Sequence, residues 1–308
     1  MAITAAMVKE LREITGAGML DCKNVLVEVN GDITKAIDVL REKGLAKAAK
    51  KSGRIAAEGL VMQMVSADNK TAALIEVNSE TDFVAKNEKF VTFVKDLAKV
   101  VLDTQVRTVE ALKALPYPGE ADKTVDQVLT ENIATIGENL SIRRIAIMGT
   151  TGTIASYTHG GGKIVVLVDV DNTDTKAEEV GKNVAMQIAA LNPEYISMSD
   201  VSDETKSKER EILLVQAMNE NQELPEGKRK PEKIIAGIVE GRLNKNLKSF
   251  CLLEQDYVKD PSLTVAKYVK EELGSDKVIK SFIRFETGEG LEKKDENFAE
   301  EVAKQLQN

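Results

Sequence analysis

The sequence predicts an α+β protein with more than one domain. At 308 residues the chain is too long for one simple core. Apolar strand-like runs alternate with periodic helical segments, and one strand–strand–helix unit occurs twice. Aromatic residues make up only 4% of the chain and tryptophan is absent, so the cores rely on aliphatic side chains. This composition favours helices and modest sheets over a β-sandwich.

The first 45 residues predict three short helices. Thr4 is placed to cap the first helix, and Gly16 and Gly18 punctuate its end. Asp32 is placed to cap the third helix, and Gly44 is expected to end it. So small a bundle has little core of its own, and modules of this shape usually bind something.

Two features of this region allow more than one interpretation. Met19 and Leu20 lie at the tight turn between the first two helices, where they either contact a partner or staple the bundle together. Residues 46–54 then carry four basic side chains and are expected to form a solvated connector or helix face. Four charges in an acidic chain do not make a convincing RNA site.

The strand–strand–helix unit follows in two copies. Residues 73–78 align without a gap with residues 166–171, which implies two related α+β subdomains. In each copy the unit comprises a strand, a turn, a second strand and a helix; these are 60–65, 68–69, 73–78 and 88–102 in the first copy, and 152–157, 159–162, 164–170 and 176–191 in the second.

A polar segment of different texture covers residues 199–248 and predicts a protruding antiparallel helical hairpin. Arms of about 17 residues would reach roughly 25 Å, and the hairpin is either a strut or a handle for a partner. Strands are expected at 251–258 and 281–286, with a helix at 264–272 between them. A final helix with an apolar face of Phe298, Val302 and Leu306 either caps its own domain or docks on another protein.

The composition excludes several classes of function. A net charge of −8 and a pI near 5.1 argue against a general nucleic-acid binder. Two cysteines far apart in the sequence indicate free thiols in a reducing compartment. No run of 18 apolar residues exists to cross a membrane, and no signal peptide precedes the first helix. We therefore expect a cytoplasmic protein.

No catalytic constellation is recognisable. His159 is the only histidine, which excludes the usual zinc sites and histidine-dependent nucleophiles. Residues 119–124 lack the second glycine of a phosphate-binding loop, so the chain is expected to bind no nucleotide itself. These observations favour a protein that is not an enzyme and that needs no cofactor or metal.

The most informative motif is Thr81-Asp82-Phe83-Val84, at the junction between a predicted strand and a predicted helix. Loops at such junctions carry function, and Phe83 is either core filler or a wedge that enters a partner. The corresponding junction of the second copy, residues 172–175, holds only capping and turn residues. The architecture therefore does not demand an aromatic residue at this corner, and both interpretations stay open on the residues alone.

Motifs spread over nearly the whole chain resemble the bacterial elongation factor Ts family, the guanine-nucleotide exchange factors of elongation factor Tu. They are Val8-Lys9-Glu10-Leu11-Arg12, Thr15-Gly16-Ala17-Gly18-Met19, Asp21-Cys22-Lys23, Asn30-Gly31-Asp32, Glu76-Val77-Asn78, Glu80-Thr81-Asp82-Phe83-Val84-Ala85-Lys86, Ile142-Arg143-Arg144, Ser156-Tyr157, His159-Gly160, Val239-Glu240-Gly241-Arg242 and Phe282-Ile283-Arg284-Phe285-Glu286.

The resemblance implies a domain organisation. Residues 1–54 would form a three-helix module like ubiquitin-associated domains, and residues 55–149 a first core subdomain. The second core subdomain would comprise 150–198 with 249–286, interrupted by a coiled-coil hairpin at 199–248. Residues 287–308 would form a C-terminal module.

The resemblance also implies a function and a set of contact residues. The protein would bind elongation factor Tu, with GDP or without nucleotide, and promote GDP release without touching nucleic acid or membrane. Phe83 would wedge between helices near the magnesium site of the GTPase, with Thr81, Asp82 and Val84 beside it. Three further residues of the N-terminal module, Arg12, Met19 and Leu20, would contact the nucleotide domain, and His159 another domain. The alternative is a binding scaffold or chaperone-like partner that leaves nucleotide exchange unchanged.

Overall fold

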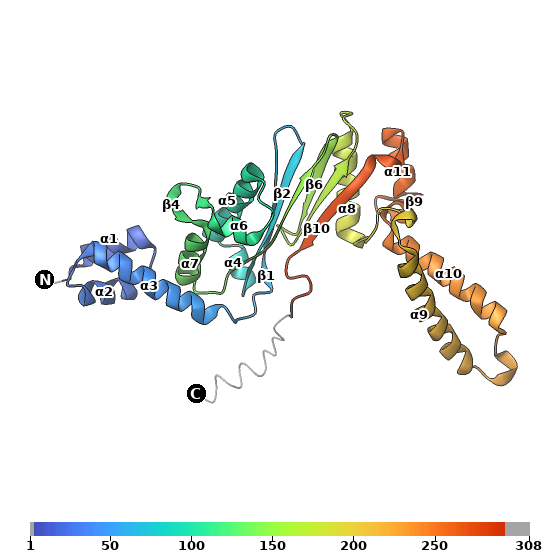
Figure 1. Cartoon of the computed structure of the whole chain (residues 1–308), viewed down its shortest axis with the longest axis horizontal. Helices are drawn as coiled ribbons and strands as arrows, with labels where there is room; N and C mark the ends of the chain where they lie inside the picture. The colour runs from blue at the N-terminus through green and yellow to red at the C-terminus, as the bar shows by residue number, and fades with distance from the viewer. Residues whose placement is uncertain (1–2, 293–308) are drawn as a thin grey trace.

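The computed structural model describes residues 3–292, which form an elongated molecule (Figure 1). Three helices stand at one end, a body of strands and helices occupies the middle, and a pair of long helices projects from the other end. This mixture of helices and small antiparallel sheets confirms the α+β class. Within residues 3–292 no helix is both long and apolar enough to cross a membrane.

The N-terminal helices are α1 (Ala5–Thr15), α2 (Met19–Glu28) and α3 (Ile33–Lys51). The Thr4 hydroxyl accepts a hydrogen bond from the Met7 amide, and the Asp32 carboxylate accepts one from the Lys35 amide, so both predicted caps are present. Gly16 ends α1 in the left-handed conformation at φ 66°. The small core between the helices consists of Val8, Leu11, Cys22, Val25, Leu26 and Ala36.

The prediction that Gly44 ends the third helix is wrong. Helix α3 continues through Gly44 to Lys51 and includes most of the expected basic connector. Gly44 is buried against helix α7 (Val125–Ile136), where a Cβ atom would lie 3.3 Å from the Ala134 Cβ. Its role is therefore close packing of two helices, which a sequence pattern does not distinguish from a helix stop.

The first half of the central body contains a three-stranded antiparallel sheet in the order β1-β2-β5. The strands are β1 (Glu58–Val65), β2 (Thr71–Ser79) and β5 (Ser141–Gly149). Between β2 and β5 the chain forms α4 (Asp82–Ala85), α5 (Glu88–Thr104), α6 (Val109–Ala114), the small hairpin of β3 (Pro116–Tyr117) and β4 (Glu120–Thr124), and α7.

The second half contains the sheet β6-β7-β10, also antiparallel. Its strands are β6 (Thr153–His159), β7 (Ile164–Val170) and β10 (Ile279–Glu286). Between β7 and β10 lie α8 (Ala177–Leu191), α9 (Asp203–Gln222), α10 (Glu232–Phe250), the hairpin of β8 (Asp256–Tyr257) and β9 (Asp260–Thr264), and α11 (Val265–Leu273). The prediction of a strand at 251–258 is mostly wrong, because residues Leu252–Glu254 form a 3-10 turn and only β8 forms a strand.

The two halves repeat more than the predicted strand–strand–helix unit. The hairpins β3–β4 and β8–β9 have the same register, with Tyr117 opposite Glu120 and Tyr257 opposite Asp260. Each hairpin leads into a helix capped by a threonine, Thr124 for α7 and Thr264 for α11. In the order of elements along the chain, the pair α9–α10 of the second half corresponds to α6 of the first half.

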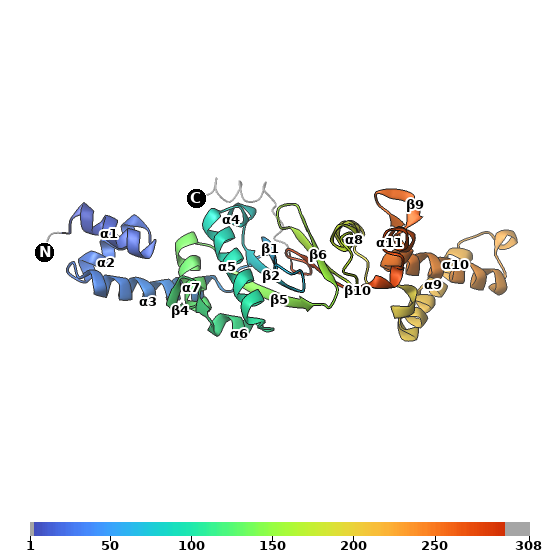
Figure 2. The ribbon, with the colours of Figure 1, turned by 90° about the horizontal axis from the view of Figure 1, so that it is seen from above.

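The two sheets pack face to face between outer helices (Figure 2). Along β2 the side chains of Ala73, Ile75 and Val77 pack with α5, whereas Ala72 and Leu74 face the second sheet. Helix α8 covers the outer face of the second sheet in the same way. The apolar layer between the sheets consists of Val61, Ala72, Leu74, Met148, Ile154, Val165, Leu167 and Phe285.

The projecting hairpin has arms of 20 and 19 residues, about 30 Å long. Its thin seam is made by Leu213, Ala217, Ile235, Val239, Leu243 and Leu247. The helix predicted from Phe298, Val302 and Leu306, together with most of the expected C-terminal module, lies outside the described residues.

Candidate protein-binding surface

The one-turn helix α4 places Phe83 on the surface. It begins two residues after the end of β2, and its two neighbouring apolar side chains differ in burial. Val84 is 8% exposed and belongs to the core beneath α5, whereas Phe83 is 80% exposed. Val84 therefore anchors the turn, and Phe83 is not core filler. An aromatic side chain this exposed on a folded surface is a candidate contact with another protein.

The carboxylate of Glu138 holds this turn in place through hydrogen bonds. Glu138 Oε2 accepts hydrogen bonds from the amides of Glu80 (3.1 Å) and Thr81 (3.0 Å). Its second oxygen accepts the Thr81 hydroxyl at 2.6 Å. Thr81 therefore does not cap α4 with its side chain but ties the turn to the segment after α7. These charge-assisted hydrogen bonds hold the backbone that presents Phe83.

Asp82 lies on the surface beside two lysines. Its carboxylate accepts a hydrogen bond from Lys86 at 2.6 Å, one helical turn further on. This hydrogen bond, with the charges of Lys86 and of Lys163 from the second half, lowers the pKa of Asp82 below its usual range. Asp82 is therefore charged at neutral pH. The β6–β7 turn lies near α4, because both contact β1.

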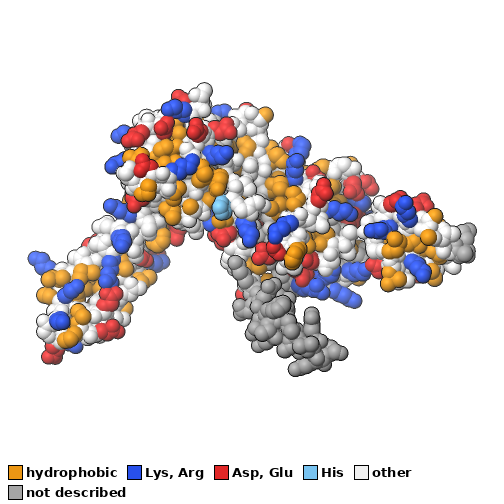
Figure 3. Space-filling view, turned by 180° about the vertical axis from the view of Figure 1, so that it is seen from behind, with side chains coloured by type: hydrophobic (Ala, Val, Ile, Leu, Met, Phe, Trp, Pro, Cys, Tyr) orange, Lys and Arg blue, Asp and Glu red, His pale blue; other side chains and the backbone are white. Residues whose placement is uncertain are grey.

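The β6–β7 turn carries His159 at its start. The ring is exposed, and its Nδ1 lies 3.2 Å from the Tyr157 hydroxyl. Gly160, Gly161 and Gly162 follow with φ values of 58°, 66° and 100°, which favour glycine. The Gly162 carbonyl accepts a hydrogen bond from the Val61 amide of the first sheet at 2.8 Å. Figure 3 shows the histidine, in pale blue, on an open face of the central body.

The remaining predicted contact residues lie in the N-terminal helices. Arg12 is exposed on α1, and Met19 and Leu20, 52% and 69% exposed, are the first residues of α2. This exposure contradicts the interpretation that they staple the bundle. The structure thus brings Thr81–Val84 and the His159 turn together on the central body, and it places Arg12, Met19 and Leu20 at one end of the molecule (Figure 1).

Comparisons with known proteins identify the family. The family model "Elongation factor TS" matches residues 80–289. Elongation factor Ts of Clostridioides difficile strain 630 is 52% identical over 99% of both chains. The proteins of that name from Clostridium botulinum strain Alaska E43 and Clostridium perfringens strain 13 are 51% and 52% identical, over 99% and 98% of both chains. The chain belongs to the elongation factor Ts family.

As a member of the elongation factor Ts family, the protein is a translation elongation factor and not an enzyme. The range matched by the family model includes Thr81–Val84, Glu138 and His159. The alignments with the relatives extend over the N-terminal helices that carry Arg12, Met19 and Leu20.

The two cysteines of this elongation factor Ts chain are buried and do not form part of an exposed contact. Cys22 and Cys251 are free and buried, and burial raises the pKa of both, that of Cys251 to about 11. Within residues 3–292 no three histidine, cysteine or acidic side chains are grouped as a metal site would require. The candidate contact residues Phe83 and His159 are exposed side chains on turns that hydrogen bonds hold in place.

Proposed function

We propose that this protein binds elongation factor Tu, in its GDP-bound and nucleotide-free states, and accelerates the release of GDP. Membership of the elongation factor Ts family supports this proposal. The observation that carries it is the side chain of Phe83, 80% exposed on a turn that Val84 and Glu138 hold in place. Such a side chain is already arranged to enter a partner and loses little conformational freedom on binding.

In the proposed mechanism Phe83 enters an apolar gap between helices of the GTPase near its magnesium ion. Burying a phenylalanine side chain contributes about 1.5–3 kcal/mol, which is available to shift those helices. The shift weakens the magnesium and phosphate contacts, and since the metal neutralises much of the phosphate charge, GDP leaves faster. Asp82 lies next to Phe83 and places a negative charge at the contact with the GTPase.

The coupling must act in both directions. A protein that weakens GDP binding to the GTPase is itself bound more weakly when GDP is present, by the same factor. A thousandfold effect corresponds to about 4 kcal/mol of coupling free energy. No covalent bond forms or breaks in this mechanism.

We further propose that separate parts of the chain hold separate domains of the GTPase. A module of residues 1–54, similar to ubiquitin-associated domains, contacts the nucleotide domain through Arg12, Met19 and Leu20. The subdomain of residues 55–149 contributes the Phe83 wedge, and 287–308 adds a C-terminal contact to the same domain. The subdomain of 150–198 with 249–286 holds another domain through His159, and the coiled coil of 199–248 projects from it.

We also propose that the protein is cytoplasmic and acts on another protein, without direct contact to nucleic acid or membrane. The exposed side chains proposed for the contacts, Phe83, Met19 and Leu20, are apolar and are typical of protein contacts.

The test is the release of fluorescent GDP from elongation factor Tu after addition of excess unlabelled GDP. We expect the protein to accelerate release in proportion to its concentration until the GTPase is saturated. Release at the spontaneous rate, combined with detectable binding of the GTPase, would contradict exchange and support the scaffold or chaperone-like alternative.

A further inference from the structure

A short segment at the end of the last strand crosses from the second sheet to the first. Residues 286–290, here called the crossing segment, begin with the last residue of β10 and contain two glycines in the left-handed conformation. At Gly288, with φ 71°, a Cβ atom would lie 2.0 Å from the Ala57 carbonyl oxygen. Only glycine therefore allows this segment to pass so close to the start of β1.

The crossing segment binds a buried carboxylate of the first sheet. Glu76 of β2 is fully buried and continues the row of Ala72 and Leu74 into the layer between the sheets. Its Oε1 accepts hydrogen bonds from the Gly288 amide at 2.8 Å and from Arg143 Nη1 at 3.0 Å. Its Oε2 accepts one from Arg144 Nε at 2.6 Å.

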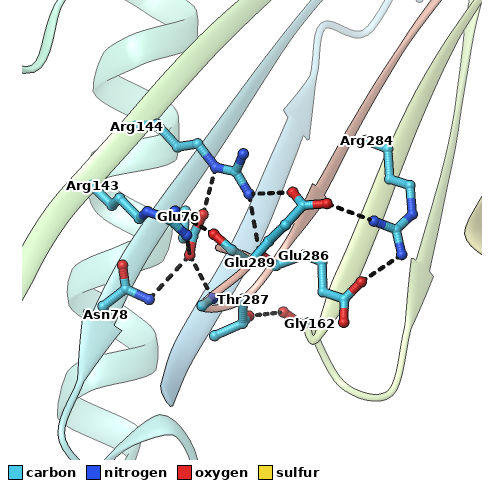
Figure 4. A network of polar contacts seen from close by, with 10 residues as sticks. Glu76, Asn78, Arg143, Arg144, Gly162, Arg284, Glu286, Thr287 and Glu289 are labelled. Atoms are coloured by element: carbon cyan, nitrogen blue, oxygen red, sulfur yellow. Dashed lines mark hydrogen bonds and ion pairs between the residues drawn. The ribbon is translucent and has the colours of Figure 1, made fainter. Parts of the chain in front are cut away.

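The same two arginines also hold the crossing segment, as Figure 4 shows. Arg144 donates to the Glu286 carbonyl at 3.1 Å and to the Glu289 carboxylate at 3.2 Å, and Arg143 donates to the Glu289 carbonyl. The Arg144 guanidinium also lies 4.1 Å from the centre of the Phe285 ring. Glu76 is thus the central acceptor of a polar network that joins the two halves of the molecule.

The crossing segment is bound at its other side to the turn that carries His159. The Thr287 amide donates to the Lys163 carbonyl at 2.9 Å, and the Thr287 hydroxyl donates to the Gly162 carbonyl at 3.2 Å. Strand β2 continues from Glu76 for three residues to its end, and α4 with Phe83 begins after two further residues. Hydrogen bonds to Glu76 and the backbone that follows it therefore connect the turn of His159 with the turn of Phe83.

Burying the charged Glu76 carboxylate costs free energy, so its presence between the sheets needs a reason. An apolar replacement of a buried ion pair is often as stable as the pair, so stability alone does not require Glu76. Apolar layers tolerate small shifts between their faces, whereas hydrogen bonds fix both distance and direction. The charged network at this place therefore adds directional contacts between the two halves to the apolar layer.

We propose that Glu76 is a positioning residue for nucleotide exchange, which fixes the separation of the Phe83 and His159 turns so that both engage the GTPase at once. This inference rests on the exchange function proposed above. Two contacts held at a fixed spacing act as one bivalent contact, because the second forms at high effective concentration once the first is made. Loss of the fixed spacing weakens this cooperation while each turn keeps its own contacts.

The first test measures the geometry and needs no partner. Spin labels are attached at Lys95→Cys on α5 and Lys182→Cys on α8, exposed positions on the two outer helical layers. With layers about 10 Å apart, the labels are separated by roughly 30 Å, within the range of pulsed electron paramagnetic resonance. Labelling is done on the folded protein, in which both natural cysteines are buried.

We expect Glu76→Gln to shift or broaden the distribution of label distances. The matched control is Glu240→Gln, which removes an exposed carboxylate from its ion pair with Arg210 on the hairpin and is expected to leave the distribution unchanged. An unchanged distribution in Glu76→Gln would overturn the proposal. If Glu76→Gln does not fold, Arg143→Met takes its place, since Arg143 is only partly buried and bridges the same groups.

The second test measures exchange at a temperature at which circular dichroism shows all variants folded. We expect Glu76→Gln to slow GDP release about tenfold, since small misplacements of a contact have effects of this size or larger. His159→Ala should slow release by a smaller factor in the Glu76→Gln background than in the natural chain. Equal factors in both backgrounds would mean independent contacts and would overturn the proposal. If the natural chain fails to accelerate release, the proposed function is wrong, and the label distances still decide whether Glu76 sets the geometry.

Discussion

Replacement of Phe83 by alanine should separate function from stability. Because the side chain is 80% exposed, only about a fifth of it is buried in the folded protein. Complete burial of phenylalanine contributes about 1.5–3 kcal/mol, so Phe83→Ala should lower the free energy of unfolding by only about 0.3–0.6 kcal/mol. The matched control is Phe93→Ala in α5: Phe93 is 2% exposed, and the loss should be about 3–5 kcal/mol.

The remaining four fifths of the Phe83 side chain become buried only in the proposed complex. They correspond to about 1.2–2.4 kcal/mol, or a loss of about 7- to 60-fold in exchange efficiency. Urea unfolding measures the first quantity, and release of fluorescent GDP measures the second. The reasoning is refuted if Phe83→Ala destabilises the protein by more than about 2 kcal/mol, or if it exchanges nucleotide as fast as the natural chain.

Three further predictions follow from the braces of this surface. Glu138→Gln should lower the free energy of unfolding by about 1–2 kcal/mol and should slow exchange. The amide group of glutamine cannot accept all the hydrogen bonds that Glu80 and Thr81 donate to the carboxylate. Equal stability of the two proteins in urea would contradict this role. Gly161→Ala should lower the free energy of unfolding by about 1 kcal/mol, through the positive φ alone. Gly162→Ala should lower it further, because the added Cβ would also clash with the first sheet. Equal urea midpoints for the two variants would contradict this difference. Burial opposes ionisation of Glu76, but the hydrogen bonds from Gly288 and its other donors outweigh burial and hold the Glu76 pKa below its ordinary 4.5. Its stabilisation is therefore complete above about pH 4.5 and is lost as the pH falls further, so unfolding of Glu76→Gln should depend less on acid than that of the natural chain.

The helices and strands with strong local patterns could be predicted from the sequence. The buried strand β2 and the amphipathic helix α5 carry continuous or periodic apolar runs that few other structures accommodate. The third strand of the first sheet, β5, was not predicted as part of a sheet, because its partly buried alternation becomes recognisable only beside β2. The packing of the two sheets against each other was also not predicted, since low aromatic content had favoured modest sheets over a sandwich.

A site residue could be predicted where it differs from the corresponding residue of the other half. It could not be predicted where its role depends on contacts with residues far away in the sequence. Phe83 could be singled out because the second half has no aromatic residue at the same junction. Glu138 could not, because 57 residues separate it from Thr81 and a single glutamate in a polar stretch carries no signal. The same holds for Glu76, since a strand residue flanked by apolar neighbours does not reveal which side chains will neutralise it.

The packing of the two sheets has a consequence for how the chain is made. The layer between the sheets takes Val61 and Leu74 from the first half and Phe285 from the end of β10. During synthesis from the N-terminus, β7 can supply Val165 and Leu167 early, but the part of the layer that β10 covers stays exposed until almost the whole described chain has left the ribosome. At about 5–20 residues per second this exposure lasts on the order of ten seconds or more, so the nascent protein must remain soluble with its central core half built.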